Sequence, residues 1–303
     1  MTIIINKCKT IDKNIIKKKK KKLTICLCIR DREKYMIYID MVFTNIEKLY
    51  SDFDFEYYIY ENNSTDKTKE LIVKFFSNRK GEYYIEDVPN SKIKGGINID
   101  RGIKMCRIRN KLKKLHKKLD SDYTLLLDSD VVFTFDTVSK LITTIEDNIK
   151  DNIVMSTPFC LCYKTYKIHN ITHYYDSFAF ISNKGLSYKD TQNTCLFNSC
   201  KLCKFLRLRR GIYINNKILY DDTQIIYTKS CFGSMALIKT DVYNNVDWNE
   251  TICEHHSFCD NISKYGKIVV NPTIKIFTSQ PELNNYNQIQ MQLNHLINKN
   301  KSS

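Results

Sequence analysis

The sequence predicts an α/β protein in which helices cover both faces of a mostly parallel sheet. Short apolar runs rich in Ile, Leu and Tyr alternate with segments whose apolar residues recur every three or four positions. This alternation is typical of parallel strands joined by crossover helices. The chain has 303 residues, of which 43% are hydrophobic and 12% aromatic, so it has enough apolar surface to bury a large core.

The chain begins with three strands separated by helices. The strands are expected at residues 23–29 (LTICLCI), 55–60 (FEYYIY) and 82–87 (EYYIED). After the first strand and the charged stretch RDRE, Met36, Ile39 and Phe43 have helical spacing. After the second strand, Ser64 or Thr65 is expected to cap the next helix.

Residues 101–119 (RGIKMCRIRNKLKKLHKKL) are expected to form one helix. In a helical projection Arg101 lies on the apolar face at the N-terminal end, and Arg109 lies at the edge of that face. The apolar face consists of Met105, Ile108, Leu112, Leu115 and Leu119. The polar face, expected to be solvated, carries Lys104, Lys111, Lys114 and Lys118. A cation at the start of such a helix lies where open α/β sheets bind ligands.

The stretch YTLLLDSDVVF, residues 123–133, is expected as the fourth strand, and it holds Asp128 and Asp130 between apolar residues. Two carboxylates this close repel each other and lose hydration when they are buried. One Mg²⁺ or Mn²⁺ would neutralise both, because these ions prefer oxygen ligands. A pair that caps the following turn is the alternative, since aspartate is common in turns.

The second half of the chain is less regular. A helix from about residue 137 to 149 and a strand at residues 152–157 come first, and residues 183–222 are expected to form a long loop with a short helix. Residues 231–243 are expected as a turn and strand, and residues 253–277 as a helix, a glycine turn and a strand. The expected organisation is a basic arm (1–22), one domain (23–283, with halves 23–135 and 136–283) and a polar tail (284–303).

The chain carries a formal net charge of +15, from 48 Lys and Arg against 33 Asp and Glu. Such a balance favours anionic partners. The run Lys17–Lys22 just before the first strand is expected to be a solvated arm, able to contact an anionic surface weakly. No apolar stretch approaches the roughly 18 residues of a membrane span, so a soluble, cytoplasmic protein is expected.

The 12 cysteines do not by themselves indicate disulfides, because several lie in apolar segments where a reduced thiol is a small hydrophobic side chain. Cys195, Cys200 and Cys203 could bind zinc together with His169 or His173. A second close Cys or His pair is missing, so the zinc hypothesis stays open.

Several motifs occur in an order that resembles a known superfamily. They are ENNSTDKT, Arg101 followed by Arg109 and Asn110, DSD, YYDSFAF and CEHH. With this order and spacing, residues 23 to 277 resemble a GT-A fold glycosyltransferase, and are most similar to the fungal capsule-associated α-1,3-mannosyltransferase family. The resemblance implies a Rossmann-like GT-A fold whose first half binds a nucleotide sugar and whose second half binds the acceptor.

The resemblance also implies an activity, which is metal-dependent transfer of a sugar, with mannose as a candidate, from a GDP- or UDP-sugar to a glycan or another hydroxyl acceptor. Mn²⁺ or Mg²⁺ would be the metal. The residues that it implies for the donor are Arg30, Glu61 and Asp66 for the nucleoside, Arg101, Arg109 and Asn110 for the diphosphate, and Asp128 and Asp130 for the metal. Beyond these it implies His255 as a further metal ligand and Asp176 and Glu254 on the acceptor side.

The acceptor-side carboxylates have two possible roles. If the reaction inverts the anomeric carbon, Asp176 or Glu254 must take the proton of the acceptor hydroxyl. If it retains the configuration, as the fungal resemblance implies, no base is needed in that position. Glu254 starts a helical pattern, EHHSFCDNISKY, and the helix dipole there favours the ionised carboxylate.

Two other functions fit part of the sequence. A nucleotidyltransferase would also combine acids, a metal and a nucleotide, but the chain has only 8 glycines and no glycine-rich phosphate loop after its first strand. A nucleic-acid-binding protein would explain the lysines, because phosphate contacts supply most non-specific affinity. It would leave the acidic pair unexplained.

Overall fold

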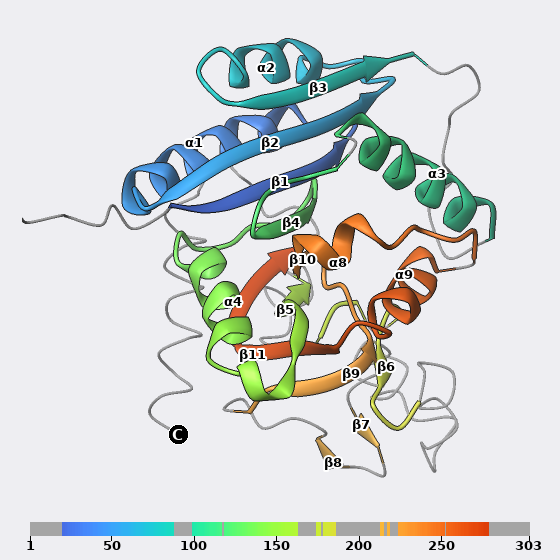
Figure 1. The fold of residues 1–303 in the computed structure, drawn as a ribbon. Coiled ribbons are helices and arrows are strands. Elements are labelled where there is room, and N and C mark those ends of the chain that lie inside the picture. The colour runs from blue at the N-terminus through green and yellow to red at the C-terminus, as the bar shows by residue number, and fades with distance from the viewer. Residues whose placement is uncertain are drawn as a thin grey trace, which may run out of the picture.

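The computed structural model describes most of residues 20 to 278 (Figure 1). The described ranges are 20–87, 99–116, 118–162, 174–176, 178–185, 213–214, 217–218, 224–251 and 253–278. Within them a nine-stranded sheet has the order β3-β2-β1-β4-β10-β5-β11-β9-β6, and β7 (Tyr213–Ile214) and β8 (Lys217–Ile218) form a separate pair.

The first half of the sheet is parallel throughout. Its elements are β1 (Lys21–Ile29), α1 (Glu33–Leu49), β2 (Phe53–Asn62), α2 (Thr68–Phe75), β3 (Gly81–Glu86), α3 (Ile99–Leu115) and β4 (Tyr123–Asp128). Phe43 of α1 and Phe75 of α2 pack edge-on against Tyr57, with ring centroids 5.3 and 5.0 Å away. The next residue of β2, Tyr58, packs on the other face against His116, just after α3, at 5.1 Å. Because neighbouring strand residues point to opposite faces, the helices cover both faces of this half, as the sequence predicts.

The second half of the sheet mixes strand directions. Its elements are α4 (Thr137–Glu146), the 3-10 turn Ile149–Asp151, β5 (Ile153–Cys162), β6 (Ile181–Ser182), β9 (Ile226–Ser230), β10 (Met235–Lys239), α8 (Thr240–Asn244), α9 (Glu254–Ile262) and β11 (Lys267–Thr278). Strand β10 lies between β4 and β5 and is antiparallel to both, whereas β5 and β11 are parallel. Helix α4 packs on β5 and β11, and α9 packs on β9. The predicted helix, glycine turn and strand near the C-terminal end are confirmed.

The basic arm is shorter than predicted, because β1 begins at Lys21. Lys21 donates two hydrogen bonds to Glu146, at 2.5 and 2.7 Å, and Lys22 pairs with Asp120 at 2.5 Å. These two lysines therefore belong to β1 and are paired with acids, while their side chains stay 40% and 39% exposed, as expected of solvated lysines. The rest of the arm before Lys20, the proposed zinc residues (Cys195, Cys200, Cys203, His169 and His173) and the tail 284–303 lie outside the described residues.

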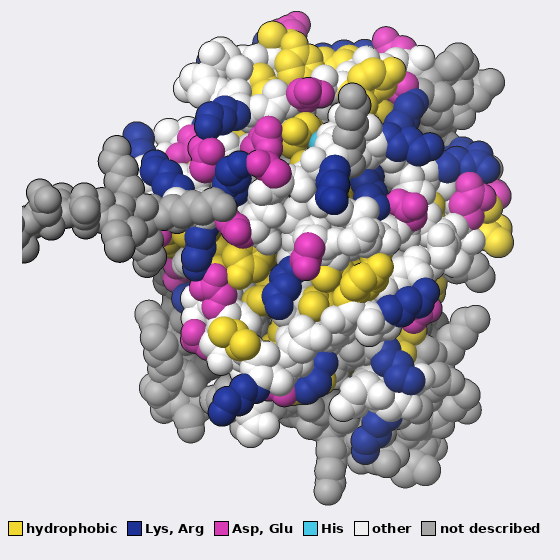
Figure 2. All heavy atoms as spheres, viewed as in Figure 1, with side chains coloured by type: hydrophobic (Ala, Val, Ile, Leu, Met, Phe, Trp, Pro, Cys, Tyr) yellow, Lys and Arg dark blue, Asp and Glu magenta, His cyan; other side chains and the backbone are white. Residues whose placement is uncertain are grey.

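Charged side chains of both signs are interspersed on the face of the molecule in Figure 2, where lysines and arginines do not gather into one basic patch. In the described part of the chain, no helix is long and apolar enough to cross a membrane.

Helix α3 is rotated relative to the projection from its sequence. Its buried residues include Cys106, Arg109 and Lys113, and Arg109, expected at the edge of the apolar face, is only 6% exposed. The helix has a second partner besides the sheet, since Cys106 Sγ donates to the carbonyl of Asn249 at 2.9 Å and Lys113 Nζ donates to the carbonyl of Val246. Hydrophobic periodicity predicts the face that meets the sheet, and it does not predict a polar face that meets a loop.

The fourth strand ends at Asp128 rather than at Phe133, because the chain after it leaves β4 and is held by other elements. Val132 exchanges two backbone hydrogen bonds with Phe277 of β11, at 2.7 and 2.9 Å. On the other side, Tyr35 of α1 donates its hydroxyl to the carbonyl of Asp128 at 3.0 Å. The hydroxyl of Tyr38, also on α1, donates to the carbonyl of Phe133 at 3.1 Å and accepts its amide at 2.9 Å. These contacts fix the backbone around the acidic pair.

Replacing Tyr38 by Phe tests the hydrogen bonds that hold the segment after β4. Tyr38 is 3% exposed, so losing its hydroxyl leaves a buried amide and a buried carbonyl without their partner. We expect the free energy of unfolding to fall by about 1 to 3 kcal/mol in urea titrations. The control is Tyr83→Phe on the edge strand β3, where the ring is 41% exposed, and this change should cost less than about 0.5 kcal/mol. Equal losses of unfolding free energy in the two variants would contradict this role of the Tyr38 hydroxyl.

Candidate active site

The candidate site lies at the carboxyl end of β4, where the two halves of the sheet meet. Asp128 is the last residue of β4 and Asp130 follows in the next turn, and both are partly exposed. Burial and the neighbouring charge of Asp128 raise the pKa of Asp130, while Arg32 and Arg101 act in the opposite direction. The second carboxylate of the pair is therefore short of positive charge.

This donor set is suited to a divalent cation, because two carboxylates at one strand end offer hard oxygen ligands and benefit from added positive charge. Among the described residues, however, no group of three or more His, Cys, Asp and Glu side chains is arranged to hold a metal. The site would thus have to complete its coordination with water or substrate oxygens, as Mg²⁺ sites usually do.

His255, predicted as a further metal ligand, is not grouped with the acidic pair in this way. Its ring is 8% exposed and stacks on Phe232 with 4.1 Å between centroids, and its Nε2 lies 3.4 Å from Oε1 of Glu254. Burial, followed by the charge of Arg109, holds its pKa well below the usual value, so the ring is neutral. Its Nδ1 is buried with no hydrogen-bond partner in the described part of the chain.

Arg109 lies in the middle of the site. Its Nη2 donates to Oδ1 of Asp128 at 2.9 Å, and its Nε lies 3.9 Å from Oε1 of Glu254. The guanidinium carbon is 4.9 Å from the ring centre of Phe232 and 4.8 Å from that of Trp248, so both rings add a cation–π contact. Burial opposes the charge, but Asp128 and Glu254 outweigh it and raise the pKa of Arg109.

Asn110, the next residue, holds the loop that carries Trp248. Its amide nitrogen donates to the carbonyl of Trp248 at 2.7 Å, and its amide oxygen accepts the backbone N–H of Trp248 at 3.0 Å. Both hydrogen-bonding groups of the side chain are engaged within the protein. The structure therefore brings Asn110 to the site without presenting it to a ligand.

The charges of two arginines act on Asp130. Arg101, in the first turn of α3, is partly exposed, and its charge acts on both Asp130 and His255. Arg32, just before α1, acts on Asp130 in the same way, and the sequence analysis did not select it. Its place in the loop after the first strand, two residues beyond Arg30, was the available signal. Arg30 itself lies 3.5 Å from the carboxylate of Asp31.

The two acids predicted to contact the nucleoside have defined partners inside the protein. Glu61 is fully buried at the end of β2, where its Oε1 accepts the amide of Ser64 at 2.6 Å and its Oε2 has no hydrogen-bond partner among the described residues. Asp66 accepts the amides of Thr68 and Glu33, each at 3.0 Å. Burial would raise the pKa of Asp66, but the hydrogen bonds from Thr68 and Glu33 lower it. Asp66 thus joins the starts of α1 and α2 and takes the capping role that the sequence pattern gave to Ser64 or Thr65.

Asp176 belongs to a short described segment beside the turn that leads into β10. Its Oδ2 accepts the backbone N–H of Gly233 at 3.2 Å. Gly233 has φ of +62°, and a Cβ there would lie 3.1 Å from Oη of Tyr174 and 3.2 Å from the carbonyl of Pro158, so this turn favours glycine. Burial, together with the charges of Asp128 and Glu254, raises the pKa of Asp176 to about 6.

Glu254 is the first residue of α9, as predicted, and is 4% exposed. Its carboxylate faces Arg109 and His255, at the distances given above. Arg109 therefore meets Asp128 and Glu254, the charges of these two acids act on Asp176, and Asp128 acts on Asp130. Of these four acids, Glu254 is the least accessible.

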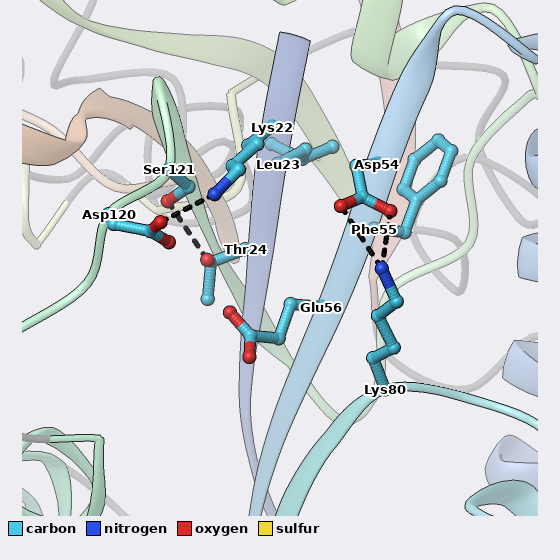
Figure 3. A pocket seen from close by; sticks show the side chains of 9 residues that line it. All are labelled: Lys22, Leu23, Thr24, Asp54, Phe55, Glu56, Lys80, Asp120 and Ser121. Carbon is cyan, nitrogen blue, oxygen red and sulfur yellow. Dashed lines mark hydrogen bonds and ion pairs between the residues drawn. The ribbon is translucent and has the colours of Figure 1, made fainter. Parts of the chain in front are cut away.

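A cavity of about 270 Å³ elsewhere on the sheet is not part of this site (Figure 3). It lies at the starts of β1 and β2, opposite to the carboxyl end that holds Asp128. Its two lysines are already paired, Lys22 with Asp120 at 2.5 Å and Lys80 with Asp54 at 2.9 Å. Open α/β sheets bind ligands at the carboxyl ends of their strands, so we do not place the function at this cavity.

Comparison with known proteins agrees with this architecture. Residues 38–244, more than half of the chain, match the family described as Glycosyl transferase family 2. Among curated proteins, none matches the sequence.

Solved structures are similar at low sequence identity. TarS from S. aureus is 14% identical with a TM-score of 0.48, over 90% of this chain and 64% of that one. The mannosyltransferase PcManGT from Pyrobaculum calidifontis, in complex with GDP-Man and Mn²⁺, is 9% identical with a TM-score of 0.47, over 87% and 58%. Glucosyl-3-phosphoglycerate synthase from Mycobacterium tuberculosis is 10% identical with a TM-score of 0.43, over 92% and 80%. The chain spans less than two thirds of the length of the first two.

The raised pKa of Asp176 predicts a stability effect that depends on pH. The folded protein binds this proton more tightly than the unfolded chain, whose carboxyl has the ordinary pKa of 3.8. The stabilising contribution of the group is therefore complete at low pH and is lost as the pH rises through about 6. We expect Asp176→Asn to raise the melting temperature at about pH 7.5 and to have little effect at about pH 4.

The control for Asp176→Asn is Asp260→Asn on the exposed side of α9, which should change the melting temperature equally at both pH values. A pH-independent effect of Asp176→Asn would show that its carboxylate is not destabilised in the fold.

Proposed function

We propose, from the premise that this chain belongs to glycosyl transferase family 2, that it moves a sugar from a nucleoside-diphosphate sugar to a hydroxyl group of a glycan or a related acceptor. The chain is a glycosyltransferase with the α/β GT-A fold. The observation that carries the assignment of the site is the pair Asp128 and Asp130 at the carboxyl end of the central strand β4, where charges of arginines from the first half act on Asp130 and the charge of Asp128 acts on Asp176 of the second. The same family match favours this function over a nucleotidyltransferase or a nucleic-acid-binding protein.

On the donor side, Asp128 and Asp130 would hold the Mn²⁺ or Mg²⁺ ion. The metal would supply positive charge to the departing diphosphate. The charges of Arg101 and Arg32 act on Asp130, and a forked guanidinium suits phosphate oxygens. Glu61, one of the two acids predicted for the nucleoside, is fully buried, so its support for the donor would be indirect, through the hydrogen bond to the amide of Ser64.

On the acceptor side, we propose Asp176 as the group that takes the proton. A pKa of about 6 keeps it ionised at neutral pH yet basic enough to be useful. The acceptor oxygen would form a bond to the anomeric carbon while the bond from that carbon to the phosphate oxygen breaks. The proton passes to Asp176, and the nucleoside diphosphate leaves with the bonding electrons. This single displacement inverts the anomeric configuration.

The identities of the substrates go beyond the family match. The resemblance to the fungal capsule-associated α-1,3-mannosyltransferases makes GDP-mannose the first donor to try, beside UDP-sugars, and it implies retention rather than inversion. A cytoplasmic location and a contact between the N-terminal lysines and an anionic surface stay predictions from the sequence.

The metal assignment predicts that a nucleoside diphosphate stabilises the protein only when Mn²⁺ is present, because the acidic pair otherwise repels the phosphates. We expect UDP or GDP with Mn²⁺ to raise the melting temperature, by an amount equivalent to about 2.7 kcal/mol when the ligand is at 100 times its Kd. Asp130→Asn removes one metal ligand and keeps the Arg109 and Asp128 pair, so it should abolish most of this shift while the ligand-free protein stays folded.

Asp260→Asn is the matched control and should respond to Mn²⁺ and nucleotide as the wild type does. The double variant Asp128→Asn with Asp130→Asn extends the test. An undiminished shift in both acidic-pair variants would remove these residues from the metal site.

Transfer assays with Asp176→Asn and Glu254→Gln distinguish the two candidate bases. With saturating donor, we expect Asp176→Asn to lower kcat by about 10²- to 10⁴-fold and Glu254→Gln to lower it less, because Glu254 faces Arg109. The wild-type rate should rise with pH through about 6, as Asp176 loses its proton. A larger loss in Glu254→Gln would make Glu254 the base, and near-normal transfer by both variants would support the retaining mechanism.

A further inference from the structure

Arg109 is almost fully enclosed by other parts of the protein. Its side chain is 7% exposed, and its ionic partners are Asp128, which is 31% exposed, and Glu254, which is 5% exposed. The rings of Phe232 and Trp248 lie within 5 Å of the guanidinium carbon. A diphosphate could reach this guanidinium only by displacing these groups, so the geometry does not support the expectation that Arg109 clamps phosphate.

The two carboxylates that meet Arg109 come from different halves of the chain. Asp128 ends β4 in the first half, and Glu254 begins α9 in the second. Without a cation between them, the buried Glu254 would lack a counter-charge, and the partly exposed Asp128 would lose its ion pair. Arg109 lies within ion-pair distance of both carboxylates, whereas His255, the other residue beside Glu254, is neutral.

The aromatic rings around Arg109 also belong to the second half, and each of them stacks on one further ring. His255 stacks on Phe232 at 4.1 Å, and Trp248 stacks on Phe258 at 3.7 Å with an interplanar angle of 3°. Asn110 holds the backbone of Trp248 through two hydrogen bonds. Arg109 and Asn110, which are adjacent in α3, therefore both bind the second half, Arg109 through its charge and Asn110 through hydrogen bonds.

We propose that Arg109 is a positioning residue, a buried cation that joins Asp128 of the donor half to Glu254 of the acceptor half and touches neither substrate. The role rests on the proposed function only in placing Asp128 at the donor. Arg109 keeps the Asp128 carboxylate in one orientation and sets the distance between the two halves. The diphosphate is left to Arg101 and Arg32, two partly exposed arginines whose charges act on Asp130.

A double-mutant cycle tests the bridge without any catalysis. Arg109→Met keeps a side chain between the rings but leaves both carboxylates unpaired, so the melting temperature should fall by roughly 5 to 10 °C. In the double variant with Glu254→Gln, one stranded charge is gone, and the loss should be clearly smaller than the sum of the two single losses. If Arg109→Met does not fold, the same cycle is run with Arg109→Lys, which keeps the charge and loses the fork.

The surface pair on the same helix is the matched control. Arg107 donates to Glu250 at 2.7 Å, but the two side chains are 69% and 46% exposed. The cycle of Arg107→Met with Glu250→Gln should be additive, since exposed ion pairs contribute little. Additive losses at Arg109 and Glu254 as well would overturn the proposed bridge.

Donor binding separates positioning from a phosphate contact. With UDP or GDP and saturating Mn²⁺, Arg101→Ala should raise the Kd by more than tenfold, Lys114→Ala on the exposed side of α3 should leave it unchanged, and Arg109→Lys should stay within about threefold of the wild type. The kcat of Arg109→Lys should nevertheless fall more than tenfold. A Kd for Arg109→Lys as high as that of Arg101→Ala would overturn the proposal. A wild type that transfers no sugar would instead refute the proposed function and leave the stability cycle standing.

Discussion

The ion pair between Arg109 and Asp128 connects more parts of this protein than any other contact at the site. Asp128 ends the central strand β4, and Arg109 projects from α3, which packs over β1 and β2. Through Glu254, Phe232 and Trp248 the same guanidinium reaches the second half. A buried charge that loses its partner costs about 3 to 5 kcal/mol, so the acidic strand end is tolerated in the fold because α3 supplies this cation.

The site is built with more negative charge than its own arginine neutralises. Arg109 compensates Asp128 and Glu254, while Asp130 and Asp176 both have raised pKa values, and in each case burial is the first cause. Burial of charge that favours the protonated form reduces stability at neutral pH. Perturbed pKa values of this kind are common at functional sites. A divalent metal ion at Asp130, bound together with the diphosphate, and a proton from the acceptor at Asp176 would relieve this cost.

The backbone around the acidic pair is rigid for reasons outside the pair itself. Two tyrosine hydroxyls of α1 and a backbone bridge to β11 hold the segment that follows β4. On the other side, Gly233 gives the turn before β10 a conformation in which its N–H meets Asp176. The carboxylates therefore stand on strand ends and tight turns, and this restricts how far each can move relative to the others.

The sequence by itself determined the features that are local in the chain. Alternating apolar runs and helical periodicities gave the order of strands and helices, and the Asp-Ser-Asp step after three leucines indicated the position of the acidic pair. The start of α9 at Glu254 was also visible, because a helix start depends on neighbouring residues.

Only the tertiary structure decided that Arg109 is buried rather than at the edge of the apolar face of its helix, that Asn110 holds Trp248, and that the charge of Arg32 acts on Asp130. Asn110 and Trp248 are 138 residues apart in the chain, and Arg32 and Asp130 are also far apart in sequence. Periodicity reports that a helix face is apolar, whereas a polar contact between distant segments depends on how the whole sheet brings them together.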